Sequence, residues 1–262
     1  MSKPEAPDSS PQQERLILVC NDDGIFSNGI RALVETASRF GEVRIVAPDR
    51  QQSAVGHSIT ISDPLRATRF ELKNGMIGTA VNGTPADCVK LATDQLMERK
   101  PDLILSGINH GSNAGINIIY SGTVSAATEG TILGYPSIAV SCMDFSEDAD
   151  LSGAQEAAAR AIQFVFDNGL PRGITLNVNA PAGPLKGLKW SKQGDSRYTD
   201  EYLERLDPMK RPYYWVTGRL EILDKGEQVD VKVLDNGYGS ITPIQYDLTA
   251  YRVLNAMKSM DI

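Results

Sequence analysis

Short apolar, β-branched runs alternate with helix-like patterns along most of this chain. The runs that predict strands are 16–20, 43–48, 102–107, 136–142 and 173–180. The stretches that predict helices are 29–40, 85–99, 123–134 and 150–166. Strands that alternate with helices favour a parallel sheet with helices on its faces. We therefore expect an α/β fold with a mostly parallel sheet, in which residues 173–180 form the last core strand.

The composition changes near Pro184, where charged turns and an aromatic run replace the earlier alternation. The pattern of residues 58–81 predicts extended, β-like segments around a turn at Lys73-Asn74-Gly75. Later β-like segments lie at 213–223, 229–234 and 240–245. The Pro- and Ser-rich start predicts a disordered tail and no secretory signal. The predicted divisions are a tail of residues 1–14, a core of 15–185 and a β-rich C-terminal extension of 186–262 that ends in a helix.

Composition also excludes some classes of protein. The 262 residues are 41% apolar and carry a net charge of −7, which disfavours a protein that coats a nucleic-acid duplex or an anionic membrane. No stretch approaches the ~20 apolar residues of a membrane span. The cysteines, Cys20, Cys88 and Cys142, form no C-x-x-C pair. They predict buried, reduced thiols in a cytoplasmic protein.

Two adjacent carboxylates, Asp22 and Asp23, directly follow the first predicted strand. Neighbouring acids repel each other unless a cation lies beside them. Polar residues also follow the strands at 43–48 and 102–107, and the carboxyl ends of parallel strands share one rim. Together with Ser53 and Asn109, the acids offer the oxygen ligands that Mg²⁺ prefers. The plainer alternative is that Asp-Asp-Gly is only a turn or a helix cap.

A glycine-rich loop, residues 107–123, leads into a predicted helix at Ser121–Thr123. Exposed N–H groups at such a helix start suit a phosphate, although the glycines could serve packing alone. Asn82–Thr84 forms another turn and helix start that could line the same pocket. The chain has no Walker loop, no G-x-G-x-x-G and no G-x-S-x-G, which disfavours nucleotide binding by those routes and serine-based acyl chemistry.

The two histidines, His57 and His110, are too far apart in sequence to indicate a zinc site. Each is compatible with a structural or surface role. Either could transfer a proton if its ring faces the cleft.

Six fragments of the chain, in register, resemble the SurE (survival protein E) family of metal-dependent nucleotidases. They are LVCNDDGIFSNGI, VAPDRQQSAVGHSIT, NGTPADCVKLA, LILSGINHGSNAG, YSGTVSAATEG and SITPIQYDLT, and they run from about Arg15 to Tyr251. The resemblance implies a Rossmann-like three-layer core and a C-terminal extension exchanged between subunits of a homodimer or homotetramer. It implies hydrolysis of nucleoside 5′-monophosphates, often also 3′-monophosphates, and in some members of short polyphosphate.

The resemblance also implies roles for individual positions. The implied ligands of one divalent cation per subunit, Mg²⁺ or Mn²⁺, are Asp22, Asp23, Ser53 and Asn109. The implied phosphate pocket consists of Asn82, Gly83, Thr84, Ser121, Gly122 and Thr123. Tyr120 stands where some family members have His, so His57 becomes the substitute proton donor to test. The catalytic residues expected are thus Asp22, Asp23 and His57.

The resulting hypothesis is metal-assisted hydrolysis of phosphomonoesters. One alternative is a phosphatase with an Asp nucleophile, although that class usually has Asp-x-Asp spacing and here the acids are adjacent. The other alternative is a nucleotide sensor that binds in the same pocket without turnover.

Overall fold

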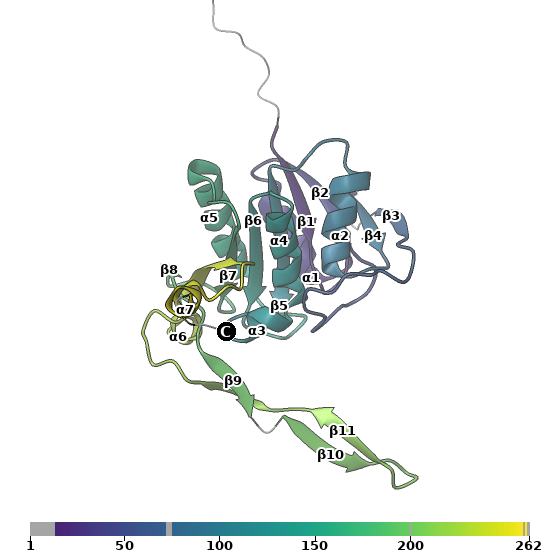
Figure 1. Ribbon diagram of the computed structural model, residues 1–262. Coiled ribbons are helices and arrows are strands. Elements are labelled where there is room, and N and C mark those ends of the chain that lie inside the picture. The colour runs from purple at the N-terminus through teal and green to yellow at the C-terminus, as the bar shows by residue number, and fades with distance from the viewer. Residues whose placement is uncertain (1–13, 72–74, 200, 259, 261–262) are drawn as a thin grey trace, which may run out of the picture.

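The computed structural model describes residues 14–71, 75–199, 201–258 and 260. Within these residues, nine strands form one sheet (Figure 1). Its strands, in spatial order, are β3 (Ala67–Glu71), β4 (Ile77–Val81), β2 (Glu42–Pro48), β1 (Leu16–Cys20), β5 (Leu103–His110), β6 (Ser137–Cys142), β7 (Ile174–Ala180), β13 (Gly239–Gln245) and β8 (Leu188–Trp190). Strands β4, β2, β1, β5, β6 and β7 run parallel, and β3 and β13 run antiparallel to their neighbours β4 and β7.

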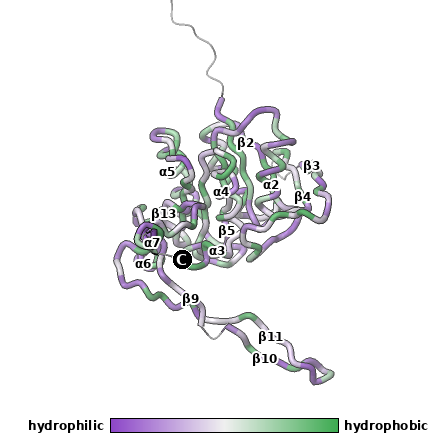
Figure 2. Tube along the Cα trace, viewed as in Figure 1, coloured by the Kyte–Doolittle hydropathy of each residue, from purple (hydrophilic) through white to green (hydrophobic). Residues whose placement is uncertain are grey.

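Helices cover both faces of this sheet, with α1 and α5 on one face and α2 and α4 on the other. The helices are α1 (Asn28–Ala37), α2 (Pro85–Leu91), the π-helical turn η1 (Ala92–Leu96), α3 (Asn117–Tyr120), α4 (Gly122–Ile132), α5 (Ser152–Asn168), α6 (Asp230–Asp235) and α7 (Tyr251–Met257). Side chains of β1 alternate between two apolar clusters. Ile17 and Val19 pack with α1 and α5, and Leu18 and Cys20 pack with α2 and α4. The predicted α/β fold with a mostly parallel sheet is therefore confirmed, and Figure 2 shows apolar residues gathered in the central strands.

Local signals explain where the helices begin. The Ser27 hydroxyl accepts the backbone N–H of Ile30 at 3.2 Å at the start of α1. Thr84 and Asp87 form a reciprocal capping box at the start of α2, with Pro85 in the first turn. The helix expected over 85–99 is confirmed as far as Leu96, but its last turn is π-helical and it ends three residues early. The Thr93 hydroxyl donates to the Val89 carbonyl at 2.9 Å, where it competes with the regular ladder, and the π turn follows.

The C-terminal extension differs most from the sequence expectations. Residues 173–180 are not the last strand of the core, because β13 pairs with β7 and β8 pairs with β13. Residues 229–234 were expected to be β-like but form α6, since tertiary contacts outweigh the propensity of the valines there. The segment 213–223 is divided at Gly218, whose φ is +115°.

An arm of paired strands projects from the core (Figure 1). Its strands are β9 (Ser196–Thr199), β10 (Tyr202–Leu206), β11 (Pro212–Val216) and β12 (Arg219–Ile222). β10 pairs antiparallel with β11, and β9 pairs antiparallel with β12. The aromatic run at 213–215 lies on β11 and is exposed.

Two of the expectations fall largely outside the described residues. These are the disordered tail, of which only Glu14 is described, and Lys73 and Asn74 of the predicted turn. The three cysteines are buried and unpaired, as predicted. None of the helices in the described part of the chain is both long enough and apolar enough to cross a membrane.

Gly29 sets how closely α1 approaches β5, and its substitution should be costly. A Cβ at this position would lie 1.9 Å from the Ile108 carbonyl oxygen. We expect Gly29→Ala to lower the free energy of unfolding by at least ~1–3 kcal/mol, because α1 must move away from the sheet. Urea unfolding measures this. Glu35→Ala on the exposed face of α1 should change it by less than ~1 kcal/mol, and equal losses in the two variants would contradict this packing.

Candidate active site

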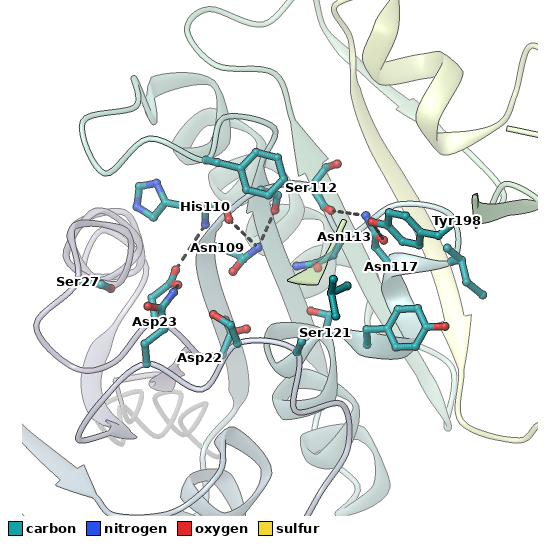
Figure 3. A pocket seen from close by; sticks show the side chains of 18 of the residues that line it. Asp22, Asp23, Ser27, Asn109, His110, Ser112, Asn113, Asn117, Ser121 and Tyr198 are labelled. Atoms are coloured by element: carbon teal, nitrogen blue, oxygen red, sulfur yellow. Dashed lines mark hydrogen bonds between the residues drawn. The ribbon is translucent and has the colours of Figure 1, made fainter. Parts of the chain in front are cut away.

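A cavity of about 1300 Å³ lies at the carboxyl ends of the parallel strands. It is lined by the segments that follow β1, β2, β5 and β6, and by the base of the arm (Figure 3). All four predicted metal ligands line it, which are Asp22, Asp23, Ser53 and Asn109. The cavity therefore lies where the rule for open α/β sheets places ligands.

Asp22 follows β1 and is buried against the start of α4, with 6% of its surface exposed. The Thr123 hydroxyl donates a hydrogen bond to its Oδ1. Gly122 allows this approach, because a Cβ there would lie 2.8 Å from the Asp22 Cβ. Burial raises the pKa of Asp22 to about 6, against the lowering effect of the Thr123 bond, and the charge of Asp23 adds to the rise.

Asp23 is half-buried beside Asp22 and is only weakly held. Its Oδ2 accepts the backbone N–H of His110 and its Oδ1 accepts the Gln51 amide, both at 3.4 Å. Burial raises the pKa of Asp23 as well. Among the described residues, neither acid forms an ion pair with a Lys, Arg or His side chain. Within the described part of the chain, the negative charge of the pair is thus not balanced by an ion pair.

Asn109 and Ser53 offer neutral oxygens in the same cavity as the acids. The Asn109 amide nitrogen donates to the Gly111 carbonyl at 2.6 Å, which leaves its carbonyl oxygen available. Figure 3 shows the Asp22 and Asp23 carboxyl groups pointing toward Asn109. The segment that carries Ser53 is tied to the site, because the Gln52 N–H donates to the Asp22 carbonyl at 2.7 Å.

The chemistry of this donor set fits a hard divalent cation. No cluster of three or more His, Cys, Asp or Glu side chains in the described part of the chain could hold a metal. A cation at this position would therefore use the two carboxylates together with the hydroxyl and amide oxygens, a combination typical of Mg²⁺ and Mn²⁺ sites.

The predicted phosphate-binding residues fall into two groups. Ser121 lines the cavity and caps α4, since its hydroxyl accepts the Val124 N–H at 3.1 Å. Gly122 and Thr123 follow it and contact Asp22, so Thr123 holds an acid in position.

The second group, Asn82–Thr84, is not part of the cavity lining. Asn82 Oδ1 accepts the Arg66 N–H at 2.6 Å, and the Thr84 hydroxyl donates to the Ser58 carbonyl at 2.7 Å. These side chains fasten the segment 58–66 to the start of α2. The geometry does not support a direct phosphate contact for them.

Of the two histidines, one lines the cavity and the other does not. His57 is not part of the cavity lining, and its Nε2 lies 2.7 Å from the Glu129 carboxylate. Glu129 also accepts from Lys90 at 2.9 Å. Burial raises the pKa of Glu129, but the bonds from His57 and Lys90 outweigh it and the net shift is downward. His110 lines the cavity instead, and its buried Nδ1 has no hydrogen-bond partner in the described part of the chain.

Sequence reasoning missed the part of the cavity that comes from the arm. Tyr198, Tyr202 and Val216 line it, and the Tyr198 hydroxyl donates to Asn117 Oδ1 at 2.8 Å. No motif marks these residues, because only the folded arrangement brings the arm beside the glycine-rich loop.

The fold and the site together define an α/β protein with an acidic ligand cavity at the ends of a parallel sheet. The family model described as "Survival protein SurE" matches residues 17–200, and the chain belongs to this family. This confirms the resemblance found in the six sequence fragments.

Similar proteins match over nearly the whole chain. A protein of Cytophaga hutchinsonii named "5'-nucleotidase SurE" is 49% identical over 246 residues, which cover 92% of this chain and 95% of that protein. A protein of Moorella thermoacetica with the same name is 47% identical over 240 residues, covering 90% and 92%. The crystal structure of the SurE protein from Aquifex aeolicus has a TM-score of 0.80 and 41% identity, covering 93% of this chain and 98% of that one.

Removing the charge of Asp22 should stabilise the protein in the absence of metal. Its folded-state pKa of about 6 lies above the ordinary value of 3.8, so the folded state binds this proton more tightly than the unfolded state. The contribution of Asp22 to stability therefore falls as pH rises from about 4 to about 6. In EDTA at pH 8, Asp22→Asn should unfold at higher urea than the wild type, by up to ~3 kcal/mol. The difference should shrink toward pH 4.

Asp150→Asn is the control of opposite sign. The Ser152 N–H lowers the pKa of the exposed Asp150 carboxylate, so its charge favours folding above pH 4. Its removal should destabilise the protein slightly at pH 8. A wild-type protein that is as stable as Asp22→Asn at pH 8 would show that the Asp22 charge carries no cost.

Proposed function

We propose that this chain is a divalent-metal-dependent 5′-nucleotidase, which hydrolyses nucleoside 5′-monophosphates to nucleoside and phosphate. The observation that carries the proposal is the pair of acids, Asp22 and Asp23, which lines a large cavity without a cationic partner among the described residues. Two relatives that cover nearly the whole chain, named "5'-nucleotidase SurE", support the same activity.

The proposed cofactor is one Mg²⁺ or Mn²⁺ per subunit, held by Asp22, Asp23, Ser53 and Asn109. When bound, the cation would supply positive charge against the phosphoryl oxygens as charge spreads in the transition state. The raised pKa values of both acids support this, because a cation beside them would relieve the cost of their charges.

The remaining roles fall to the residues around the acids. The first turn of α4, which begins beside Ser121, presents backbone N–H groups suited to the other phosphate oxygens. Thr123 keeps Asp22 in place. Asp23 has an oxygen that is only weakly hydrogen-bonded, so we assign it to orient the attacking water and to accept its proton.

The size of the cavity supports a substrate larger than phosphate alone. Its volume of about 1300 Å³ exceeds that of an ordinary small-ligand pocket, ~300–1,000 Å³. A nucleoside can therefore be accommodated beside the phosphate. The proposal includes nucleoside 3′-monophosphates and short polyphosphate as further substrates.

The proposed assembly is a homodimer or homotetramer built with the C-terminal extension. The arm exposes large apolar side chains, and Trp215 and Val216 have 61% and 76% of their surfaces accessible. Exposed apolar groups of this kind favour contact with a second copy. The three buried free thiols favour a reducing compartment, for which we propose the cytoplasm.

Phosphate release from AMP tests this function. We expect turnover with Mn²⁺ or Mg²⁺ and none after chelation with EDTA. Asp22→Asn and Asp23→Asn should each lower kcat/KM by at least about 100-fold while the protein stays folded. Asp63→Asn, an exposed acid away from the cavity, is the matched control and should keep wild-type activity.

Two other results would overturn the proposal. AMP binding without phosphate release, with every metal tried, would indicate the nucleotide sensor. Trapping of a phospho-aspartate would indicate the Asp-nucleophile phosphatase. The burial of Asp22 against Thr123 disfavours Asp22 as that nucleophile, since a nucleophile must reach the phosphorus.

Substitution of each histidine distinguishes their contributions to kcat. We expect His110→Gln to lower kcat by about tenfold or more, because this ring lines the cavity and proton transfer typically contributes about 100-fold or more. His57→Gln should lower kcat less, since its ring is paired with Glu129. Steady-state kinetics with AMP measures both, and a larger loss in His57→Gln would restore His57 as the proton donor.

A further inference from the structure

A buried carboxylate in the C-terminal extension holds the glycine-rich loop of the cavity. Asp230, the first residue of α6, is 0% exposed. Its Oδ2 accepts the backbone N–H of Gly115 at 2.8 Å, and its Oδ1 accepts those of Gly194 at 2.9 Å and Val231 at 2.8 Å. One side chain thus joins the loop after β5, the turn before β9 and the start of α6.

We call the contact between the glycine-rich loop and the base of the arm the seam. Two further hydrogen bonds belong to it. The Ser196 hydroxyl accepts the Ile116 N–H at 2.9 Å, and the Tyr198 hydroxyl donates to Asn117 Oδ1 at 2.8 Å. All four of these residues line the cavity. The seam therefore fixes the position of one wall of the proposed active site.

The seam is tightly packed and leaves little room for adjustment. Gly115 has φ of +58°, and a Cβ there would lie 2.4 Å from the Ser196 hydroxyl oxygen. Within the described residues, Asp230 is bound by backbone amides and forms no ion pair. Burial of a carboxylate is costly, so its three amide bonds are needed to keep it there.

This wall lies away from the acids. Figure 3 shows Asp22 and Asp23 at one side of the cavity, and Asn117 and Tyr198 at the other, with Ser121 between them. A phosphate held near Asp22 and Ser121 would direct its nucleoside toward the wall formed by the arm.

We propose that Asp230 is a positioning residue for nucleoside binding. By holding Gly115 and Gly194 together, it sets where residues 116–117 and Tyr198 stand and so shapes the nucleoside half of the cavity. This inference rests on the proposed nucleotidase function. It assigns to the extension a direct part in the site within one chain, in addition to any role in assembly.

Asp230→Asn is the test substitution because it changes the volume very little. An amide offers one acceptor oxygen and one donor nitrogen, whereas all three partners of Asp230 are N–H donors. If the amide nitrogen takes the place of Oδ2, it faces the Gly115 N–H and that hydrogen bond is lost. If it takes the place of Oδ1, it faces the Gly194 N–H and that hydrogen bond is lost.

The experiment compares the wild type and Asp230→Asn with AMP and Mn²⁺. We expect KM for AMP and the competitive inhibition constant of adenosine to rise about tenfold, the size expected for loss of a charge-assisted hydrogen bond. The inhibition constant of inorganic phosphate and the Mn²⁺ concentration for half-maximal activity should stay within about twofold. The value of kcat should stay within about threefold.

Two variants make the result interpretable. Asp235→Asn, exposed at the end of the same helix, should match the wild type. Gln193→Ala removes a milder link in the seam, the 2.9 Å bond from its side chain to the Gly115 carbonyl. It should shift KM in the same direction by a smaller factor, and it replaces Asp230→Asn if that variant fails to fold in a thermal melt.

Several outcomes would overturn the inference. These are an unchanged KM in both seam variants, a fall in kcat alone, or an equal weakening of phosphate and adenosine. If the wild type releases no phosphate from AMP, the proposed function fails separately. Calorimetric binding of AMP with Mn²⁺ then decides the role of Asp230, and a tenfold weaker affinity in Asp230→Asn would support it.

Discussion

The site depends on two neighbouring carboxylates whose charges the described part of the protein does not compensate. Asp22 is buried, and Asp23 is held by two long hydrogen bonds. Thr123 and the start of α4 reduce the cost for Asp22 but do not remove it, because its pKa remains raised. Such a local cost is typical of functional sites, where stability is given up for binding. The remainder of the fold fixes this pair in place.

Strand register brings the other oxygens to the acids. Cys20 of β1 pairs with Ser106 of the adjacent strand β5. Asp22 follows this pair by two residues and Asn109, near the end of β5, follows it by three. Gly29 lets α1 lie directly on Ile108, and Gly122 lets α4 approach Asp22. Small residues at close contacts therefore determine the geometry of polar groups that lie one or two positions away.

Much of this arrangement follows from the sequence, because parallel strands end at one rim. Asp22, Asp23, Ser53 and Asn109 were predicted from strand exits alone, and they line one cavity. Non-local contacts were beyond such reasoning. From the sequence, the hydroxyl of Thr84 and the ring of His57 are as suitable for ligand binding as the residues that line the cavity. In the fold, Thr84 instead hydrogen-bonds to the Ser58 carbonyl, and His57 pairs with Glu129. Likewise, α6 forms where its valines favour a strand, and the arm reaches the cavity without any motif.

Calorimetric titration of Mn²⁺ into the EDTA-stripped protein tests whether the acid pair binds a divalent cation. We expect one Mn²⁺ bound per chain, with proton release that is larger at pH 6 than at pH 8, because part of the Asp22 population must lose its proton at the lower pH. Two buffers of different ionisation enthalpy report the protons released. Absence of binding, or binding that persists unchanged when Asp22 and Asp23 are both replaced by Asn, would show that the two acids are not a cation site.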